Sequence, residues 1–347
     1  MFSDTNIVKN SEENSAIPLL FILFPYLCSK IRNMQSTLPI HFAPLQGYTE
    51  AFYRNAHATY FGGIESYYTP FIRLEKGGFR NKDVREIEPG NNRVPHIIPQ
   101  LLASSFEKAE AILALFTEKG YQEADINLGC PFPLLAGRHN GSGILPYPEE
   151  VESLLSLVKK YPQISFSVKM RLGWENPEEC MRLLPILNEL PLRQVTMHPR
   201  VGKQQYKGEV NLEAFAAFME ACRHPLIYNG DIRKLEDIHR IQEQFPALAG
   251  IMIGRGLLAN PALAWEYKEK SQLTPDELRQ KVQMLHTSVY EQYTERLQGG
   301  DAQLLSKMKP FWEYLLPEAD RKLLKAIHKS SNLSKYNQAV LAFFNQR

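Results

Sequence analysis

The segment EADINLGC, residues 123–130, decides how the rest of the chain is interpreted. Its first half alternates like a buried strand, and its second half ends abruptly at Gly129 and Cys130, followed by Pro131. A small polar cluster at the end of a buried strand is typical of the place where α/β barrels carry their chemistry. Cys130 is therefore the first candidate reactive group, although an isolated cysteine is also often a small apolar filler.

Similar apolar, β-branched runs recur along the chain. The eight runs are residues 40–45, 64–71, 94–102, 123–130, 165–172, 193–200, 225–231 and 249–256. Their starts are about thirty residues apart, which is the length of one strand–helix crossover unit. Eight such units predict an α/β fold, a closed parallel TIM (β/α)8 barrel rather than a doubly wound sheet.

Segments with helical period lie between most of these runs. Capping residues or prolines predict helix starts at Ser104, Pro148, Pro177 and Asn211. The link 73–93 is polar and contains glycine, so we expect it to be a loop with little helix. After residue 265 the strand pattern stops, and residues 275–297, 301–316 and 318–330 predict helices with a helical tail to residue 347.

These patterns divide the chain into three parts: an N-terminal extension over residues 1–36, a barrel over 37–264 and a small all-helical domain over 265–347. The apolar run at 17–28 is shorter than the roughly 20 residues that span a bilayer, and the start lacks the basic residues of a signal peptide. Met34 immediately precedes the first strand-like run. We therefore expect residues 1–33 to be an upstream extension or a misassigned start, and residues 1–36 to be poorly ordered.

Composition narrows the class of protein. The net charge of +2 excludes a strongly basic protein, so a polyanion would need a local basic patch. The four cysteines, Cys28, Cys130, Cys180 and Cys222, form no CxxC pair. That spacing argues against a disulfide framework or a zinc site and predicts a protein of the reducing cytoplasm. We expect no membrane contact, because the apolar run at 17–28 is too short to span a bilayer.

In such a barrel the C-terminal ends of the strands share one mouth. The residues at these ends are Pro44, Leu45, Gln46, Gln100, Asn127, Cys130, Lys169, Arg171, His198, Arg200, Asn229, Gly230, Asp231, Gly254, Arg255 and Gly256. A lone lysine or histidine there is often structural, but this many polar groups on one rim indicate a site. The glycines at 229–231 and 254–256, on adjacent strands, expose backbone N–H groups and indicate a phosphorylated cofactor.

The motifs APLQG, NLGCP, VKMRLGW, HPR, NGD and MIGRG, in this order, resemble those of the tRNA-dihydrouridine synthases, and KMKPFWEYL resembles the C-terminal signature of that family. The resemblance covers roughly residues 38–345. It implies an FMN-binding barrel that reduces particular uridines in tRNA, with NADPH or NADH as the reductant. The residues that it implies for FMN are Pro44, Leu45, Gln46, Gln100, Lys169, His198, Asn229, Gly230, Asp231, Gly254 and Arg255. It also implies that Cys130 is the catalytic acid.

The chemistry of the reaction favours a thiol at that position. Saturating the uracil 5,6 double bond needs a hydride at carbon 6 and a proton at carbon 5. A thiol with a pKa of about 8.5 is protonated near neutrality, whereas a carboxylic acid near 4 is not. We expect Lys169 beside the pyrimidine edge of the flavin, where it would favour the anionic reduced form, and Gln100 on the same edge.

The segment after Cys130 departs from the family pattern. Phe132, Pro133 and Leu134 stand where a lysine is usual, and Arg138 or His139 is a candidate substitute. The glycine-bounded stretch FPLLAGRHNGSG suits a loop that closes over a bound base.

A tRNA substrate requires a basic surface as well as a pocket. The helical domain carries Arg321, Lys322, Lys325 and Lys329 with no acid between residues 321 and 335, which predicts contact with the RNA backbone, although a solvated helix face is the simpler interpretation. Asn127, Arg171 and Arg200 are expected to contact the substrate. The alternatives are an FMN barrel acting on free pyrimidines or related small molecules, and a catalytically inactive RNA-binding protein. We expect a monomer.

Overall fold

The computed structural model describes residues 37–345, and the extension expected over residues 1–36 lies outside the described residues. Nine short parallel strands form one sheet in the order β5-β2-β1-β11-β10-β9-β8-β7-β6. They are β1 (Ile40–Phe42), β2 (Ser66–Tyr68), β5 (Ile97–Ile98), β6 (Gln100–Leu101), β7 (Glu123–Leu128), β8 (Ser165–Gly173), β9 (Gln194–Val201), β10 (Leu226–Asn229) and β11 (Gly250–Ile253).

The two ends of this sheet belong to one predicted run. β5 and β6 are separated only by Pro99, which has no N–H to donate to a ladder. β5 pairs with β2 and β6 pairs with β7, so the interrupted run closes the ring. The first strand pairs with the last through Ile40 opposite Ile251. The eight predicted strand positions and the barrel are confirmed.

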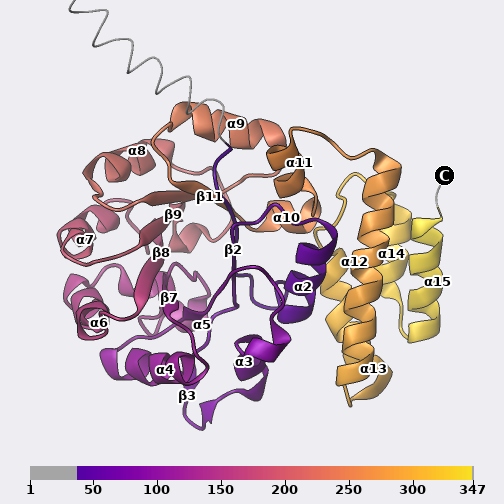
Figure 1. Ribbon diagram of the computed structural model, residues 1–347, viewed down its shortest axis with the longest axis horizontal. Helices are drawn as coiled ribbons and strands as arrows, with labels where there is room; N and C mark the ends of the chain where they lie inside the picture. Colours follow the sequence, from indigo (N-terminus) through magenta and orange to yellow (C-terminus); the bar gives the residue numbers. More distant parts are fainter. Residues whose placement is uncertain (1–36, 346–347) are drawn as a thin grey trace, which may run out of the picture. The chain divides into compact units, whose positions relative to one another are not determined.

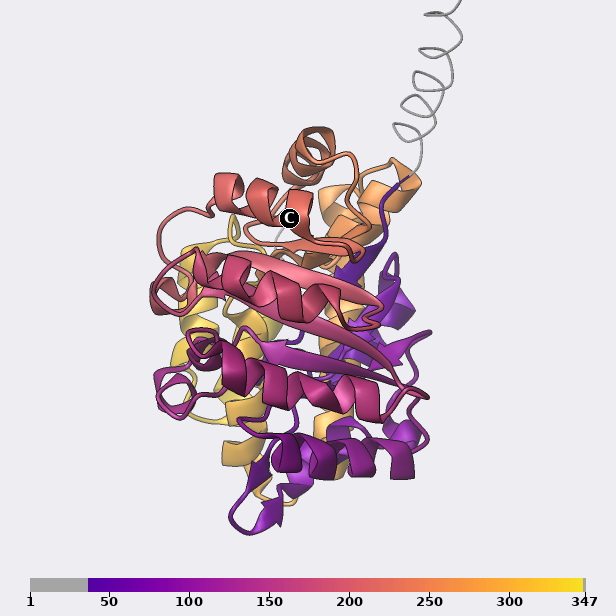
Figure 2. The same cartoon turned by 90° about the vertical axis from the view of Figure 1, so that its left-hand side faces the viewer.

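Helices surround the strands, as Figures 1 and 2 show. The outer helices are α2 (Ala51–Tyr60), α3 (Asn81–Glu86), α4 (Phe106–Glu118), α6 (Pro148–Lys160), α7 (Glu179–Asn188), α8 (Leu212–Ala221) and α9 (Leu235–Gln244), followed by α10 (Arg255–Ala259) and α11 (Leu263–Glu269). Asn211 caps α8 by accepting from the Ala214 N–H, whereas Ser105, not Ser104, caps α4. Their apolar faces form a core with the strands that includes Phe116, Phe166 and Phe215, each fully buried.

The link 73–93 contains more structure than its composition predicts. It holds the hairpin β3 (Leu74–Glu75) and β4 (Gly78–Phe79), the short α3, and a 3-10 turn at Pro89–Asn91. Arg54, which is fully buried on α2, fixes this segment. Its guanidinium donates to the Glu86 carboxylate at 2.9 Å and to the Asn92 side-chain oxygen at 2.6 Å.

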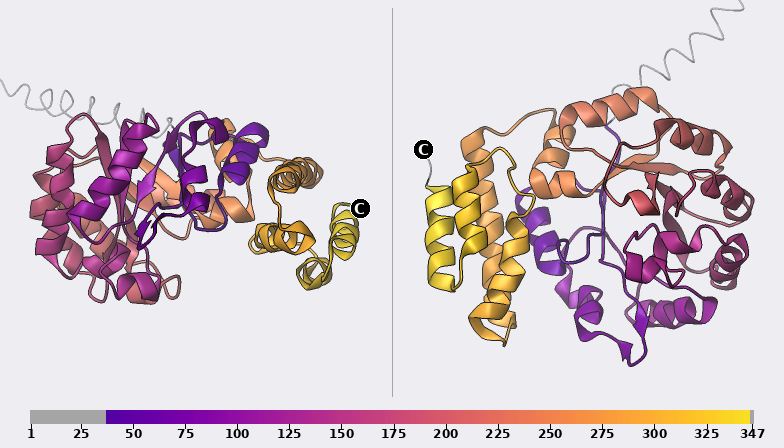
Figure 3. Two further views of the ribbon diagram at one scale, coloured as in Figure 1. Left: turned by 90° about the horizontal axis from the view of Figure 1, so that it is seen from below. Right: turned by 180° about the vertical axis from the view of Figure 1, so that it is seen from behind.

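The C-terminal region is helical, with α12 (Pro275–Arg296), α13 (Gly300–Met308), a 3-10 turn η4 (Lys309–Trp312), α14 (Arg321–Lys329) and α15 (Leu333–Phe344). α12 lies beside α2 (Figures 1 and 3), and the Lys281 ammonium donates to the Tyr60 carbonyl at 2.8 Å. Glu50, which precedes α2, accepts from Lys307 at 2.7 Å and from the Tyr293 hydroxyl at 2.6 Å. The domain boundary at residues 264 and 265 stays a prediction. None of the helices between residues 37 and 345 combines the length and apolarity needed to cross a membrane.

We expect Arg54→Ala to lower the free energy of unfolding by about 3 to 5 kcal/mol, because the change leaves the mostly buried Glu86 carboxylate, 14% exposed, without its charge partner. Urea unfolding followed by circular dichroism measures this value. Lys160→Ala is the control, since its ion pair with Glu110 lies at the surface. Similar unfolding midpoints for the two variants would contradict the role assigned to Arg54.

Candidate active site

Asn127 fixes the position of Cys130. Asn127 lies near the end of β7, and its side-chain oxygen accepts from the N–H of Gly129 at 3.0 Å and of Cys130 at 2.9 Å. From the other side, the Cys130 carbonyl accepts from the N–H and the hydroxyl of Ser142, at 3.0 and 2.9 Å. The cysteine is thus held at the end of the strand by partners on both sides.

A buried carboxylate orients Asn127 in turn. Asp125 is fully buried and accepts from Ser167 at 2.6 Å and from the Gln100 amide at 2.7 Å. The Gln100 oxygen then accepts from the Asn127 amide at 2.7 Å. Burial raises the pKa of Asp125, and the hydrogen bonds from Ser167 and Gln100 oppose that shift. The Asn127 amide nitrogen donates to Gln100 and its oxygen accepts from Gly129 and Cys130. Flipping the amide would place a donor against donors, so only one orientation satisfies these hydrogen bonds.

Positive and neutral basic groups form the wall beside Cys130. Burial lowers the pKa of Lys169 to about 8, and the nearby Arg171 contributes to the same shift. Burial also lowers the pKa of Arg171 to about 10, and its side chain donates to the Gly129 carbonyl at 3.1 Å. Burial and the surrounding cations hold the pKa of His198 well below its usual value, so this imidazole is neutral at pH 7. The wall therefore attracts an electron-rich group.

A second charged group lies at the ends of β9 to β11. Arg200 is buried and donates to both carboxylate oxygens of Asp231, and Arg255 lies 3.4 Å from the same carboxylate. Burial alone would raise the pKa of Asp231, but the Arg200 hydrogen bonds together with the charges of Arg200, Arg255 and Arg233 outweigh burial and hold this pKa below its usual value. Gly230 leaves room here, because a Cβ at that position would lie 3.3 Å from the His198 ring.

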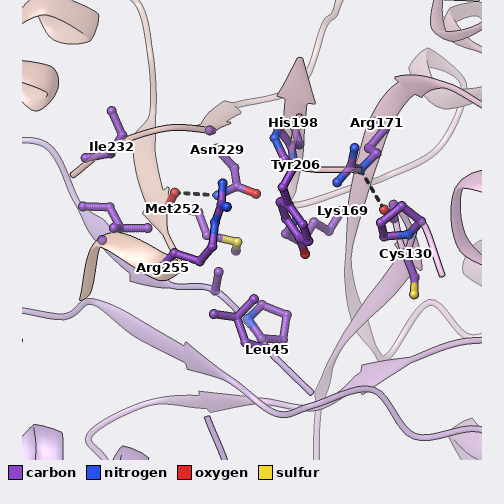
Figure 4. Close-up of a pocket in the computed structure, with 18 of the residues that line it drawn as sticks. Leu45, Cys130, Lys169, Arg171, His198, Tyr206, Asn229, Ile232, Met252 and Arg255 are labelled. Carbon is purple, nitrogen blue, oxygen red and sulfur yellow. Dashed lines mark hydrogen bonds between the residues drawn. The ribbon is translucent and has the colours of Figure 1, made fainter. Parts of the chain in front are cut away.

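These groups share one cavity of about 160 Å³, shown in Figure 4. The predicted residues that line it are Pro44, Leu45, Gln46, Asn127, Cys130, Lys169, Arg171, His198, Asn229, Gly230, Asp231, Gly254, Arg255 and Gly256. Gln100 and Arg200 are not in its lining, since both are buried behind it and bonded to protein partners. The four basic residues on α14 are exposed and are not in the lining either.

Tyr206 is one of the lining residues that the sequence reasoning missed, together with Pro70, Phe71, Ile232, Arg233 and Met252. Figure 4 shows its ring between Arg255 and Arg171, and the two guanidinium carbons lie 4.4 and 5.5 Å from the ring centre. It lies in the turn after β9, where Gln205 adopts a positive φ of 51°. The sequence feature that could have indicated Tyr206 is its position eight residues after His198, in a polar turn bounded by Gly202 and Gly208.

The segment after Cys130 is folded against it. Residues Pro133–Ala136 form α5 and Gly141–Ile144 form the buried 3-10 turn η2. A Cβ at Gly141 would lie 2.7 Å from the Cys130 Cβ, so this contact requires glycine. His139 stacks on Tyr147 with ring centres 4.1 Å apart and lies 2.8 Å from the Glu150 carboxylate. This histidine is therefore engaged with Tyr147 and with the first turn of α6, whereas Arg138 is exposed.

The arrangement defines a class of protein. A parallel eight-unit barrel with a thiol, a perturbed lysine and a basic wall at its strand ends is typical of a barrel enzyme whose site attracts an anionic group. The family model for dihydrouridine synthase matches residues 41–345. The chain belongs to the dihydrouridine synthase family, whose members are flavin-dependent oxidoreductases, and the family resemblance stated from the motifs is confirmed.

Individual relatives agree with the family. The chain is 31% identical over 235 residues to the tRNA-dihydrouridine(16) synthase of Pseudomonas syringae pv. tomato, covering 65% of this chain and 74% of that protein. It is 28% identical over 246 residues to tRNA-dihydrouridine synthase B of Vibrio cholerae, covering 69% and 73%. Among solved structures, morphinone reductase superposes with a TM-score of 0.47 at 12% identity, covering 70% of this chain and 91% of that one; a likeness at this level adds nothing to the assignment.

Burial raises the pKa of the Cys130 thiol, and the N–H of Phe132 and the charge of Arg171 offset this only in part. A raised pKa means that the protonated thiol predominates at pH 7 and that the thiolate forms only at higher pH. We therefore expect alkylation of Cys130 by iodoacetamide to be slow at pH 7 and to accelerate with an inflection above the ordinary thiol range. Peptide mass spectrometry measures the rate, and rapid alkylation at pH 6 would contradict the assignment.

Proposed function

We propose that the protein is a tRNA-dihydrouridine synthase that uses FMN and NADPH, with NADH as the alternative donor. The observation that carries the proposal is the pairing of a protonated thiol, Cys130, with a basic cavity wall. The family supports the reaction and the tRNA-dihydrouridine synthase names of the relatives support the substrate.

The residues in the cavity suit a flavin mononucleotide. Arg255, Gly230 and Gly254 offer a positive charge and closely approachable backbone, as a phosphate requires. Lys169 and the neutral His198 offer donors to the electron-rich edge of the ring system. These groups line the first cavity, of about 160 Å³, and a second cavity of about 250 Å³ adjoins it at Cys130. FMN, when bound, supplies the hydride for carbon 6 of the uracil.

The protein provides the proton and the alignment. Cys130 donates its thiol proton to carbon 5, and its raised pKa keeps that proton available at pH 7. Asn127 holds the cysteine in place, and Gln100 and Asp125 keep Asn127 in one orientation. We therefore assign Gln100 to positioning Asn127, and we assign Arg200 to positioning Asp231.

Replacing the acid tests this proposal directly. We expect Cys130→Ala to lower the rate of dihydrouridine formation in tRNA by about 10²- to 10⁴-fold, because general acid catalysis contributes that much. Nucleoside mass spectrometry of tRNA incubated with flavin-loaded protein and NADPH gives the rate. Cys222→Ala, at the end of α8, is the matched control and should keep the parent rate. An unchanged rate in Cys130→Ala would refute the assignment, and no dihydrouridine from the parent protein would refute the proposed function.

We further propose that α14 contacts the tRNA backbone. Ile327 is the buried residue of this helix, whereas its basic side chains, Arg321, Lys322, Lys325 and Lys329, are exposed. Within residues 37–345 none of these four forms an ion pair. Such a face binds phosphates and releases counterions.

Replacing all four residues by Ala should weaken tRNA binding, and the slope of log affinity against log salt should become shallower by about 0.7 to 0.9 for each lost phosphate contact. Fluorescence anisotropy over a salt series measures both. A control that replaces four exposed lysines elsewhere, Lys108, Lys159, Lys234 and Lys270, removes the same charge. If both variants change binding equally, only net charge matters and α14 is not a specific contact.

A further inference from the structure

A second cavity of about 250 Å³ adjoins the first. Its wall combines Leu45, Gln46, Tyr48, Cys130, Pro131, Phe132, Pro133, Gln205, Tyr206, Arg255 and Tyr314. Six of these also line the first cavity, so the two spaces meet at Cys130 and Tyr206. Four aromatic rings, from four separate segments of the chain, face this second space.

Phe132 lines this cavity and is exposed to solvent, so its ring is not part of the hydrophobic core. Seven large apolar side chains are exposed among residues 37–345, and three of them, Phe132 (53%), Leu134 (70%) and Tyr206 (46%), lie at or beside this opening. The backbone under Phe132 is fixed, because its carbonyl accepts from the N–H groups of Leu135 and Ala136, both at 2.9 Å. An exposed aromatic ring on a fixed backbone segment, next to a candidate reacting group, is typical of a binding surface.

Tyr48 and Tyr314 also line this cavity. Their ring centres are 5.3 Å apart in an edge-to-face arrangement. The Tyr48 hydroxyl donates to the Glu313 carboxylate at 2.6 Å, so the loop after β1 is joined to the chain that follows η4. This contact holds the rings in place before any ligand arrives, which lowers the entropy cost of binding.

We propose that this second cavity binds the base of a nucleotide next to the reacting uridine, stacked on Phe132 and Tyr314. The inference rests on the proposed function, since it needs an RNA substrate whose target base occupies the space at Cys130. Aromatic faces stack on any base, and the amides of Gln46 and Gln205 can meet its polar edge. Among the described residues that line this cavity, Arg255 is the one with a charged side chain. The cavity therefore suits a neutral base better than a phosphate.

A fluorescent base placed beside the target tests the site. The probe is a tRNA in which 2-aminopurine replaces the nucleotide on the 5′ or the 3′ side of the uridine that the parent protein reduces. Stacking quenches 2-aminopurine, so binding to flavin-loaded protein should quench one of the two probes. Phe132→Ala or Tyr314→Ala should abolish this quenching and weaken tRNA binding by about 5- to 150-fold, the range for loss of one stacked base.

Two controls separate stacking from misfolding. Phe132→Tyr keeps an aromatic face and should restore quenching and affinity. Leu341→Ala removes another exposed apolar side chain, on α15, and should change neither. Flavin content, read from absorbance, should be the same in every variant.

The inference is overturned if Phe132→Ala and Tyr314→Ala bind and quench like the parent, or if quenching occurs only when 2-aminopurine replaces the target uridine itself. In either case the parent protein would still form dihydrouridine, so the proposed function would stand alone. If the parent forms no dihydrouridine in tRNA, the proposed function and this inference both fail.

Discussion

The site depends on the hydrogen bonds through which the Asn127 side chain holds the backbone of Cys130. A thiol at the end of a strand could point in several directions, and a proton donor has to point in one. Asn127 achieves this because its own amide is fixed by Gln100, and Gln100 is fixed by the buried Asp125. The backbone that carries the reacting thiol is therefore positioned by a series of hydrogen bonds that begins at a buried carboxylate inside the barrel.

The same burial that secures this network sets the electrostatics of the cavity. Removing Lys169 and Arg171 from water lowers their pKa values, and removing Cys130 raises its own. In all three groups burial favours the uncharged form. A bound anion would raise the pKa values of Lys169 and Arg171 again and so favour their charged forms. The thiol stays protonated while the wall still attracts electron density. One physical cause, desolvation, thus serves both the acid and the cofactor wall.

Contacts between the barrel and the C-terminal helices extend the site beyond the barrel. Tyr48 bonds to Glu313, and Glu50 bonds to Lys307 and Tyr293. These contacts come from adjacent turns of the chain after β1, which also supplies Leu45 and Gln46 to the cavity. A helical region fixed to this loop contributes Tyr314 to the second cavity. The helices therefore shape the approach to Cys130 as well as carrying the basic face of α14.

Sequence reasoning located most of the lining because parallel barrels bring strand ends to one mouth. Fourteen of the sixteen residues chosen from strand ends line the first cavity. Sequence reasoning could not distinguish the residues that line the cavity from residues that are buried behind the lining. Gln100 lies opposite Asp125 in the strand register and Arg200 lies near the end of β9, and both side chains turn to protein partners, Asp125 and Asp231.

The sequence by itself determined the eight-unit barrel, the helical C-terminal region and the family, because these follow from local periodicity and from motifs within single segments. Tertiary structure alone decided the role of Tyr206, the closure of the sheet at Pro99 and the aromatic wall of Tyr48, Phe132 and Tyr314. Those features join side chains that are tens or hundreds of residues apart, or depend on how one side chain turns. Neither spacing nor composition records such contacts, since they exist only after the barrel has closed.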